Sequence, residues 1–132
     1  MNAESFFKSM YFDIWQSNAI EKLDQYYSES FSETIDTTDE NNEPITLSLD
    51  YQGIAQQSRF QKENYKDTTF KIKKLVASDN TISVHFYSSS IDKRTNELKH
   101  RCVCGIWHLD NDNKIDRVSA VVTPFYPGER CK

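Results

Sequence analysis

Apolar and polar residues alternate with a period of two through much of the second half of the chain, which is the pattern of β-strands. Residues 99–124 read KHRCVCGIWHLDNDNKIDRVSAVVTP, two runs of β-branched and aromatic residues around an Asp/Asn cluster, which predicts a hairpin. Residues 69–77 and 81–90 show similar alternation around a tight Ser-Asp-Asn turn. The pattern therefore predicts a meander of four long antiparallel strands.

In the first half, apolar residues recur at steps of three and four, the period of one helix face. This predicts a helix over residues 4–16, with Asn2 as a candidate N-cap. A second helix is predicted over residues 18–28, because Asn18 followed by Glu21 resembles a capping box. Both helices carry an apolar side that needs a partner, so we expect them to pack as a corner or hairpin.

A third helix is predicted over residues 51–64, with Asp50 as its N-cap. Short strands are predicted at residues 31–36 and 45–49, joined by the acidic loop DTTDENNEP. Helices that precede a meander indicate an α+β fold. We expect a cone-shaped, curved antiparallel β-sheet packed on three N-terminal helices, with a cavity between them, and one domain over residues 1–132.

Composition narrows the classes of partner. The net charge of −4 predicts neither a nucleic-acid partner nor an anionic membrane surface. No segment has the length of a membrane span or the pattern of a signal peptide, so we expect a cytoplasmic protein. Cys102 and Cys104 stand two apart on one predicted strand, about 7 Å along it, which disfavours a disulfide between them.

Four segments carry a resemblance to a known family: LDQYYSESF, YQGI, FKIKKLVASDNTISVHF and GIWHLDNDNKIDRVSA. Together they resemble the nuclear transport factor 2-like superfamily, and within it the SnoaL-like domain proteins. Asn113 stands where the family often has Gly, which a turn tolerates because Asn adopts positive φ. The resemblance implies a cone-shaped fold with a cavity and a homodimer through the exposed sheet face. It is shared by cyclases, isomerases, dehydratases, hydrolases and non-catalytic binding modules, so the fold does not settle the function.

Two residues are candidate catalysts. Asp36 follows the second helix, at a position comparable to that of a general-base Asp in ketosteroid-isomerase-like proteins, although Thr37 replaces their Pro. A carboxyl group between apolar walls can shuttle a proton beside a carbonyl. The alternative is a solvated turn residue. His85 lies mid-strand and can act as an acid or base near neutral pH if its face lines the cavity. The alternative is a histidine on the outer face.

Aromatic residues and one arginine are candidates for the lining of the cavity. Tyr hydroxyls can donate to a carbonyl oxygen, and an inward Arg can hold a carboxylate. The predicted ligand-binding residues are Tyr11, Trp15, Tyr26, Tyr27, Phe86, Arg101 and Trp107.

No metal or cofactor is predicted. Two histidines and two cysteines share one strand face, but they step about 7 Å apart, whereas zinc places its sulfur ligands within about 4 Å. These four residues are His100, Cys102, Cys104 and His108. We expect the cysteines to be small buried hydrophobes and the histidines to lie near strand ends.

Two functions remain open. The first is acid–base catalysis of isomerisation, cyclisation or dehydration on a small apolar carbonyl compound, without a cofactor. The second is a ligand carrier or a protein–protein interaction module that uses the cavity or the sheet face. The register of the hairpin also stays open. Val103, Trp107 and Leu109 share one face of its first strand, and the other face carries Cys102, Cys104 and Ile106.

Overall fold

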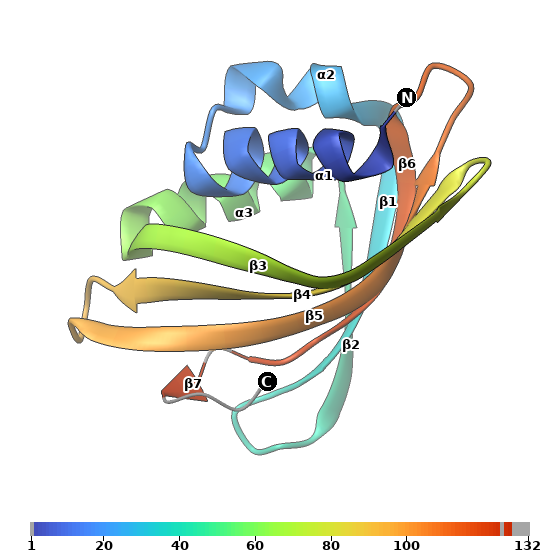
Figure 1. Cartoon of the computed structure of the whole chain (residues 1–132). Helices are drawn as coiled ribbons and strands as arrows, with labels where there is room; N and C mark the ends of the chain where they lie inside the picture. Colours follow the sequence, from blue (N-terminus) through green and yellow to red (C-terminus); the bar gives the residue numbers. More distant parts are fainter. Residues whose placement is uncertain (1, 125, 128–132) are drawn as a thin grey trace.

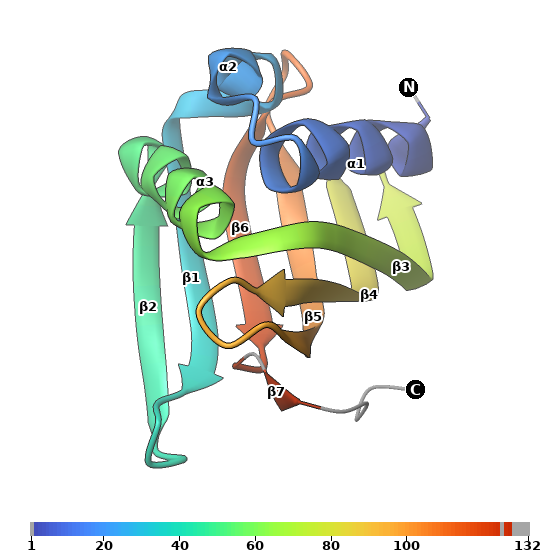
Figure 2. The same ribbon diagram turned by 90° about the vertical axis from the view of Figure 1, so that its left-hand side faces the viewer.

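The chain forms one long, bent sheet with its helices on the concave side (Figures 1 and 2). The computed structural model describes residues 2–124, 126 and 127. The elements in chain order are α1 (Ala3–Tyr11), a π-helical turn η1 (Phe12–Gln16), a 3₁₀ turn η2 (Ile20–Lys22), α2 (Leu23–Tyr26), β1 (Tyr27–Thr38), β2 (Pro44–Asp50), α3 (Tyr51–Asn64), β3 (Tyr65–Ser78), β4 (Thr81–Asp92), β5 (Glu97–Leu109), β6 (Ile115–Val122) and β7 (Tyr126–Pro127).

The strands pair in the order β2-β1-β6-β5-β4-β3, and β7 pairs with β5. The hairpin of β5 and β6 therefore lies in the middle of the sheet, and β2 lies at an edge. The α+β class is confirmed, and the sheet is mixed: β1 runs parallel to β6, with Glu33 opposite Val118. This parallel pair forms because β6, late in the chain, runs beside β1 in the same direction. The remaining described strand pairs are antiparallel.

Two helix starts follow from local hydrogen bonds. The Asn2 side chain accepts a bond from the backbone N–H of Ser5 at 2.9 Å. Asp50 accepts one from the backbone N–H of Gly53 at 2.8 Å, and α3 has the predicted bounds. Each carboxyl or amide oxygen satisfies an N–H that the first helical turn leaves without a backbone partner. These caps fix the two helices, α1 and α3, that cover the sheet.

The predicted second helix is wrong in its start and its length. Asn18 has a φ of 54°, outside the helical region, so it is not an N-cap. Its amide instead donates to the backbone oxygen of Ser58 in α3 at 2.9 Å. Helical structure is confined to η2 and the four residues of α2, because Tyr27 already pairs with Ile115 in the sheet. Long-range pairing thus overrides the local helical pattern.

The structure settles the register of the central hairpin. Val103, Trp107 and Leu109 are 8%, 7% and 8% exposed and face the helices. Ile106, on the opposite face, is 42% exposed. The turn before β6 holds Asn113 at a φ of 60°, as the turn prediction requires. One face of β5 therefore belongs to the core and the other lies on the convex surface.

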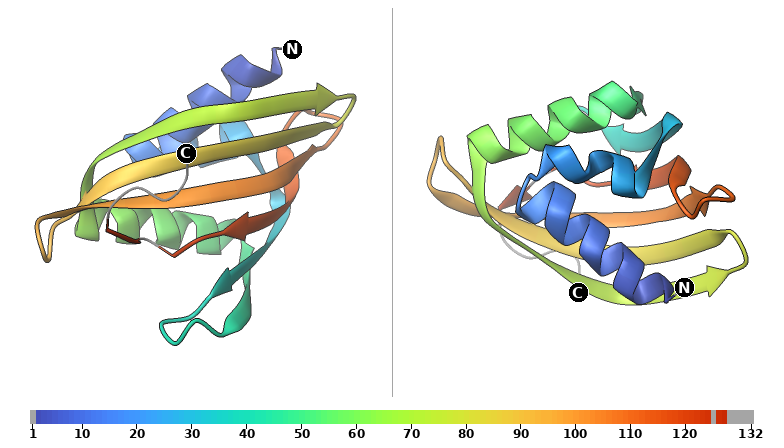
Figure 3. Two further views of the ribbon diagram at one scale, coloured as in Figure 1. Left: turned by 60° about the horizontal axis from the view of Figure 1, so that its bottom comes forward. Right: turned by 90° about the horizontal axis from the view of Figure 1, so that it is seen from above.

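An edge-on aromatic cluster joins α1 to the concave face of the sheet. The ring of Phe7 lies 5.0 Å from that of Trp107 and 5.5 Å from that of Phe86, both in T-shaped contacts. Such contacts add to the apolar area that α1 buries. Figure 3 shows α1 and α3 over the sheet with α2 between them when seen from above, and in its left-hand view the β1–β2 hairpin extends beyond the helices. Among the described residues, no helix has the length and apolar character needed to cross a membrane.

Candidate functional site

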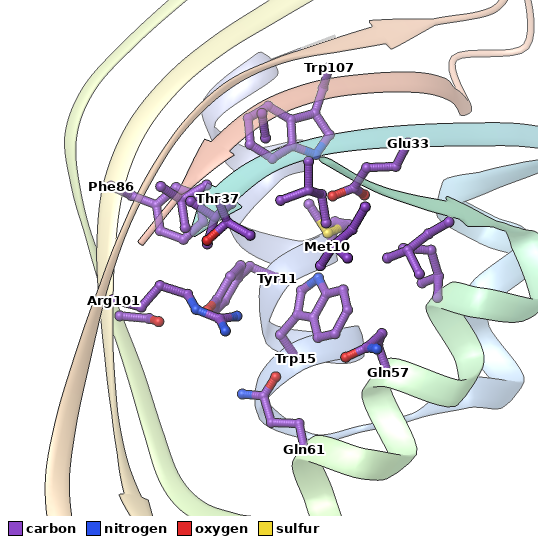
Figure 4. A pocket seen from close by; sticks show the side chains of 18 of the residues that line it. Met10, Tyr11, Trp15, Glu33, Thr37, Gln57, Gln61, Phe86, Arg101 and Trp107 are labelled. Carbon is purple, nitrogen blue, oxygen red and sulfur yellow. The ribbon is translucent and has the colours of Figure 1, made fainter. Parts of the chain in front are cut away.

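A cavity of about 240 Å³ lies between the concave face of the sheet and helices α1 and α3. Figure 4 shows aromatic side chains such as Tyr11, Trp15 and Trp107 around it, together with several polar side chains. Leu47 of β2 and Phe60 of α3 line it and are 46% and 48% exposed, so the cavity opens between these two elements. Gln57 and Gln61 of α3 lie on the same wall. A concave, mostly apolar space with a few polar groups is typical of small-molecule sites.

The strand register orders the lining into rows. Glu33 lies opposite Val118, which lies opposite Trp107, so these side chains form one row across three strands. Arg101 lies opposite Ser88 in another row. Arg101 and Trp107 are six residues apart on β5. At a rise of ~3.3 Å per residue, the two rows are therefore about 20 Å apart along the strand. Glu33 and Arg101 therefore lie at opposite ends of the cavity, as Figure 4 shows.

Glu33 is the acidic group of the cavity wall. Burial raises the pKa of its carboxyl from 4.5 to about 7. Within the part of the chain that the structure describes, no hydrogen bond or ion pair reaches it. With such a pKa, both the protonated and the ionised form of the carboxyl group are present near neutral pH. General acid–base catalysis requires both forms.

The Tyr27 side chain lines the same cavity as Glu33. Tyr27 is 2% exposed, and its hydroxyl donates to the Met10 sulfur at 3.5 Å. Burial raises its pKa first, the charge of Glu33 raises it further, and a side-chain hydrogen bond with Trp15 acts in the opposite direction. Tyr27 therefore stays protonated at neutral pH. Because a thioether is a weak acceptor, this hydroxyl can turn to a stronger acceptor that enters the cavity.

The other end of the cavity carries a positive charge. Burial lowers the pKa of Arg101, and the phenols of Tyr11 and Tyr65 act against that shift. A guanidinium nevertheless stays charged at neutral pH. Tyr11 is 7% exposed; burial raises its pKa, while a hydrogen bond with Ser88 and the charge of Arg101 lower it. Arg101, Ser88 and Tyr11 thus gather hydrogen-bond donors around one point.

The structure places both predicted catalytic residues outside the cavity, which corrects those predictions. Asp36 is exposed on the convex face, where it accepts a hydrogen bond from the Thr46 hydroxyl at 2.8 Å. His85 lies opposite Cys104, also on the convex face. Successive side chains of a strand point to opposite faces of the sheet, and Asp36 and His85 stand at the positions that point away from the cavity.

Glu33 was missed, although its strand carries a signal for it. Phe31 is 2% exposed, and Ile35 lines the cavity together with Glu33. Residues two apart on a strand share a face, so the apolar pair on either side of Glu33 marks it as inward. The same argument applied to Asp36 places it outward. The polar lining residues Thr37, Gln57, Gln61 and Ser88 were missed as well.

Most of the predicted ligand-binding residues do lie in the cavity wall. These are Tyr11, Trp15, Tyr27, Phe86, Arg101 and Trp107, and their role in binding stays a prediction. Tyr26 lies elsewhere: its hydroxyl donates to the Asp13 carboxylate, and its ring contacts Phe6 at 5.8 Å. Burial and that carboxylate raise the pKa of Tyr26 to about 12. The difference arises because the chain changes from helix to strand between Tyr26 and Tyr27.

The histidines and cysteines of β5 lie on the convex side and do not gather. His100 contacts the Ser89 hydroxyl at 2.7 Å, and His108 contacts the Arg117 guanidinium at 3.3 Å. Cys104 is exposed, so the expectation that it is a buried hydrophobe is wrong. Across residues 2–124, 126 and 127, no three His, Cys, Asp or Glu side chains are grouped as a metal site requires.

Comparisons with known proteins identify the fold. No family model matches the chain, and no curated protein does. Among solved structures, a SnoaL-like polyketide cyclase from Agrobacterium tumefaciens superposes with a TM-score of 0.69 at 14% identity, covering 92% of this chain and 91% of that one. A phenazine biosynthesis-related protein from Pseudomonas aeruginosa gives 0.62 at 14% identity, covering 92% and 80%.

A third structure is a protein with a ketosteroid isomerase-like fold from Catenulispora acidiphila, in complex with trimethylamine. It gives a TM-score of 0.62 at 7% identity, covering 83% of this chain and 79% of that one. At such identities the likeness shows the fold alone. The resemblance expected from the sequence is confirmed at that level.

Proposed function

Because the chain has the SnoaL-like fold of the nuclear transport factor 2-like superfamily, we propose that it binds a small, mostly apolar carbonyl compound and transfers a proton on it. The observation that carries this proposal is Glu33: a carboxyl group in the cavity wall, with a pKa of about 7 and no partner among the described residues. The surrounding aromatic walls favour an apolar ligand over a strongly hydrated one.

Glu33 and Tyr27 have different roles in the proposed proton transfer. The Glu33 carboxylate takes a proton from a carbon next to the carbonyl group. The electron pair of that C–H bond forms a C=C bond, and the π electron pair of the carbonyl group moves to its oxygen, which gives an enolate. The Tyr27 hydroxyl, in the same cavity lining, leaves the Met10 sulfur and donates to this oxygen. The protonated Glu33 then returns its proton to the same carbon or to another one, and no cofactor is needed.

Hydrogen–deuterium exchange tests the proposal. In heavy water near neutral pH, the probe 2-tetralone, a bicyclic ketone with acidic C–H bonds, should gain deuterium faster with the protein than without it. Glu33→Gln should remove most of this acceleration, by about a hundredfold or more. Asp36→Asn is the matched control, because it removes a carboxylate from the opposite face of the same strand.

Two outcomes contradict the proposal. The first is 2-tetralone exchange with the wild type that is no faster than in buffer. The second is acceleration that survives in Glu33→Gln. If the probe binds with no exchange, the cavity is that of a carrier, the second function left open by the sequence.

A homodimer through the convex face belongs to this proposal as well. Val121 and Ile106 are 62% and 42% exposed there, although both lie on central strands. Light scattering should give twice the monomer mass, and Val121→Lys should reduce it, whereas a monomeric wild type contradicts the dimer. A cytoplasmic location and a single domain over residues 1–132 stay predictions.

A further inference from the structure

The end of the cavity opposite Glu33 carries a charged group that the proton transfer does not use. Arg101 extends from β5 into the wall, and its Nε atom is fully buried. A guanidinium is costly to bury, and a structure that needed only packing here would take an apolar residue. Its guanidinium brings N–H donors to an end of the cavity that is far from Glu33.

Hydroxyl groups lie around this guanidinium. Ser88 is directly across from Arg101 on the neighbouring strand, where side chains lie about 5 Å apart at Cβ. Ser88 is 3% exposed and lines the cavity together with Tyr11 and Arg101, and both Ser88 and the charge of Arg101 lower the pKa of Tyr11. The three side chains come from β5, β4 and α1, so the fold itself brings them together.

From this arrangement we infer that the ligand carries a carboxylate, which Arg101 holds with help from Ser88 and Tyr11. A planar guanidinium presents two parallel N–H donors that match the two oxygens of a carboxylate. A carboxylate matches this planar pair of donors in shape and carries the opposite charge. The inference rests on the proposed function, and it names the substrate class of the same cavity.

The length of the cavity sets the shape of this ligand. The rows of Arg101 and Glu33 lie about 20 Å apart along the strands, less the reach of both side chains. The ring of Phe86 lies between these two ends, because Phe86 is opposite Val103. It contacts the rings of Tyr11 and Trp107. The substrate class is therefore an elongated aromatic acid, with the carboxylate at one end and the acidic C–H bond at the other.

Calorimetry with two probes of the same shape tests the inference. The probe 2-naphthoate carries the carboxylate, and 2-naphthamide is its neutral counterpart. The wild type should bind 2-naphthoate at least about tenfold more tightly than 2-naphthamide, since hydrogen bonds to charged groups are the strong ones. Arg101→Gln should remove this preference, and Arg101→Lys should restore only part of it, because an ammonium lacks the planar fork.

Two controls keep the test clear. Arg117→Gln removes an equal charge from the exposed convex face and should leave the preference unchanged. Should Arg101→Gln fail to fold, Ser88→Ala provides a smaller change that should weaken 2-naphthoate binding and leave 2-naphthamide binding as it was. Equal binding of both probes by the wild type overturns the inference, as does failure of 2-naphthoate to bind. A preference that survives in both Arg101→Gln and Ser88→Ala overturns it as well.

The binding test of the carboxylate site and the exchange test of the proton transfer can succeed or fail independently. Exchange of 2-tetralone that depends on Glu33, together with equal binding of the two naphthalene probes, upholds the proton transfer and overturns the carboxylate site. A preference for 2-naphthoate that depends on Arg101, without any exchange of 2-tetralone, upholds the carboxylate site and overturns the proton transfer.

Discussion

Replacing Glu33 by Gln should stabilise the protein in alkaline solution. Gln has nearly the shape of a protonated Glu and carries no charge at any pH. Since burial raises the Glu33 pKa from 4.5 to about 7, the folded protein holds a proton there at pH values where the unfolded chain has released it. The contribution of Glu33 to stability is then fully present below pH 4.5 and is lost as the pH rises from 4.5 through about 7.

The size of this effect follows from the pKa. A rise from 4.5 to about 7, at about 1.36 kcal/mol per pKa unit, corresponds to about 3 kcal/mol of unfolding free energy. The wild type loses that amount between about pH 4 and about pH 8.5, and Glu33→Gln does not. The variant should therefore equal the wild type in acid and exceed it by up to about 3 kcal/mol in alkali.

Urea unfolding followed by circular dichroism at several pH values measures the difference. Glu40→Gln serves as the control, because it removes the same charge from an exposed loop. Taking the difference between variant and wild type at each pH cancels the titration of every other group. Parallel curves for Glu33→Gln and the wild type across the whole range would refute the argument that burial raises the Glu33 pKa.

Three further predictions concern stability. Gly105→Ala should cost about 1–3 kcal/mol in urea unfolding, because a Cβ there would lie 2.9 Å from the Ala120 Cβ and 2.9 Å from the Ser119 oxygen; adding Ala120→Gly should recover part of the loss, and no recovery would show that the clash is misplaced. Asp92→Asn should lower Tm at neutral pH and flatten its fall in acid, since hydrogen bonds from Arg94 and Lys99 hold the Asp92 pKa well below its usual range; an unchanged Tm contradicts this. Asp50→Ala should cost about 1 kcal/mol through the lost N-cap of α3, and an equal loss in Asp50→Asn would exclude a capping role.

Much of the fold follows from local patterns in the sequence. Period-two alternation locates β3 to β6, and Asp50 marks the start of α3 because an N-cap is a local interaction. The helix predicted after Asn18 fails for the opposite reason. Its outcome depends on the pairing of Tyr27 with Ile115, which lies far along the chain, and on the bond from Asn18 to Ser58. Local propensity cannot report such partners.

The candidate site was harder to predict because it depends on which strand face points inward. The choice of Asp36 rested on resemblance, whereas the flanking Phe31 and Ile35 already place Glu33 inward by alternation. For β5 the sequence is ambiguous, since both faces carry apolar residues. Burial of Trp107 and exposure of Ile106 decide it only once the strand is packed under α1. The raised pKa of Glu33 follows from that packing and has no local sequence signal.

The most direct test of the central claim is a carbon-13 NMR titration of the Glu33 carboxyl, assigned by comparison with Glu33→Gln. The account predicts a midpoint at about 7 in the free protein. It also predicts that saturating 2-tetralone moves this resonance and leaves that of the exposed Glu40 in place. A midpoint near 4.5, or a Glu33 resonance that does not respond to the probe, would contradict the claim that the Glu33 carboxyl group acts on the bound ligand.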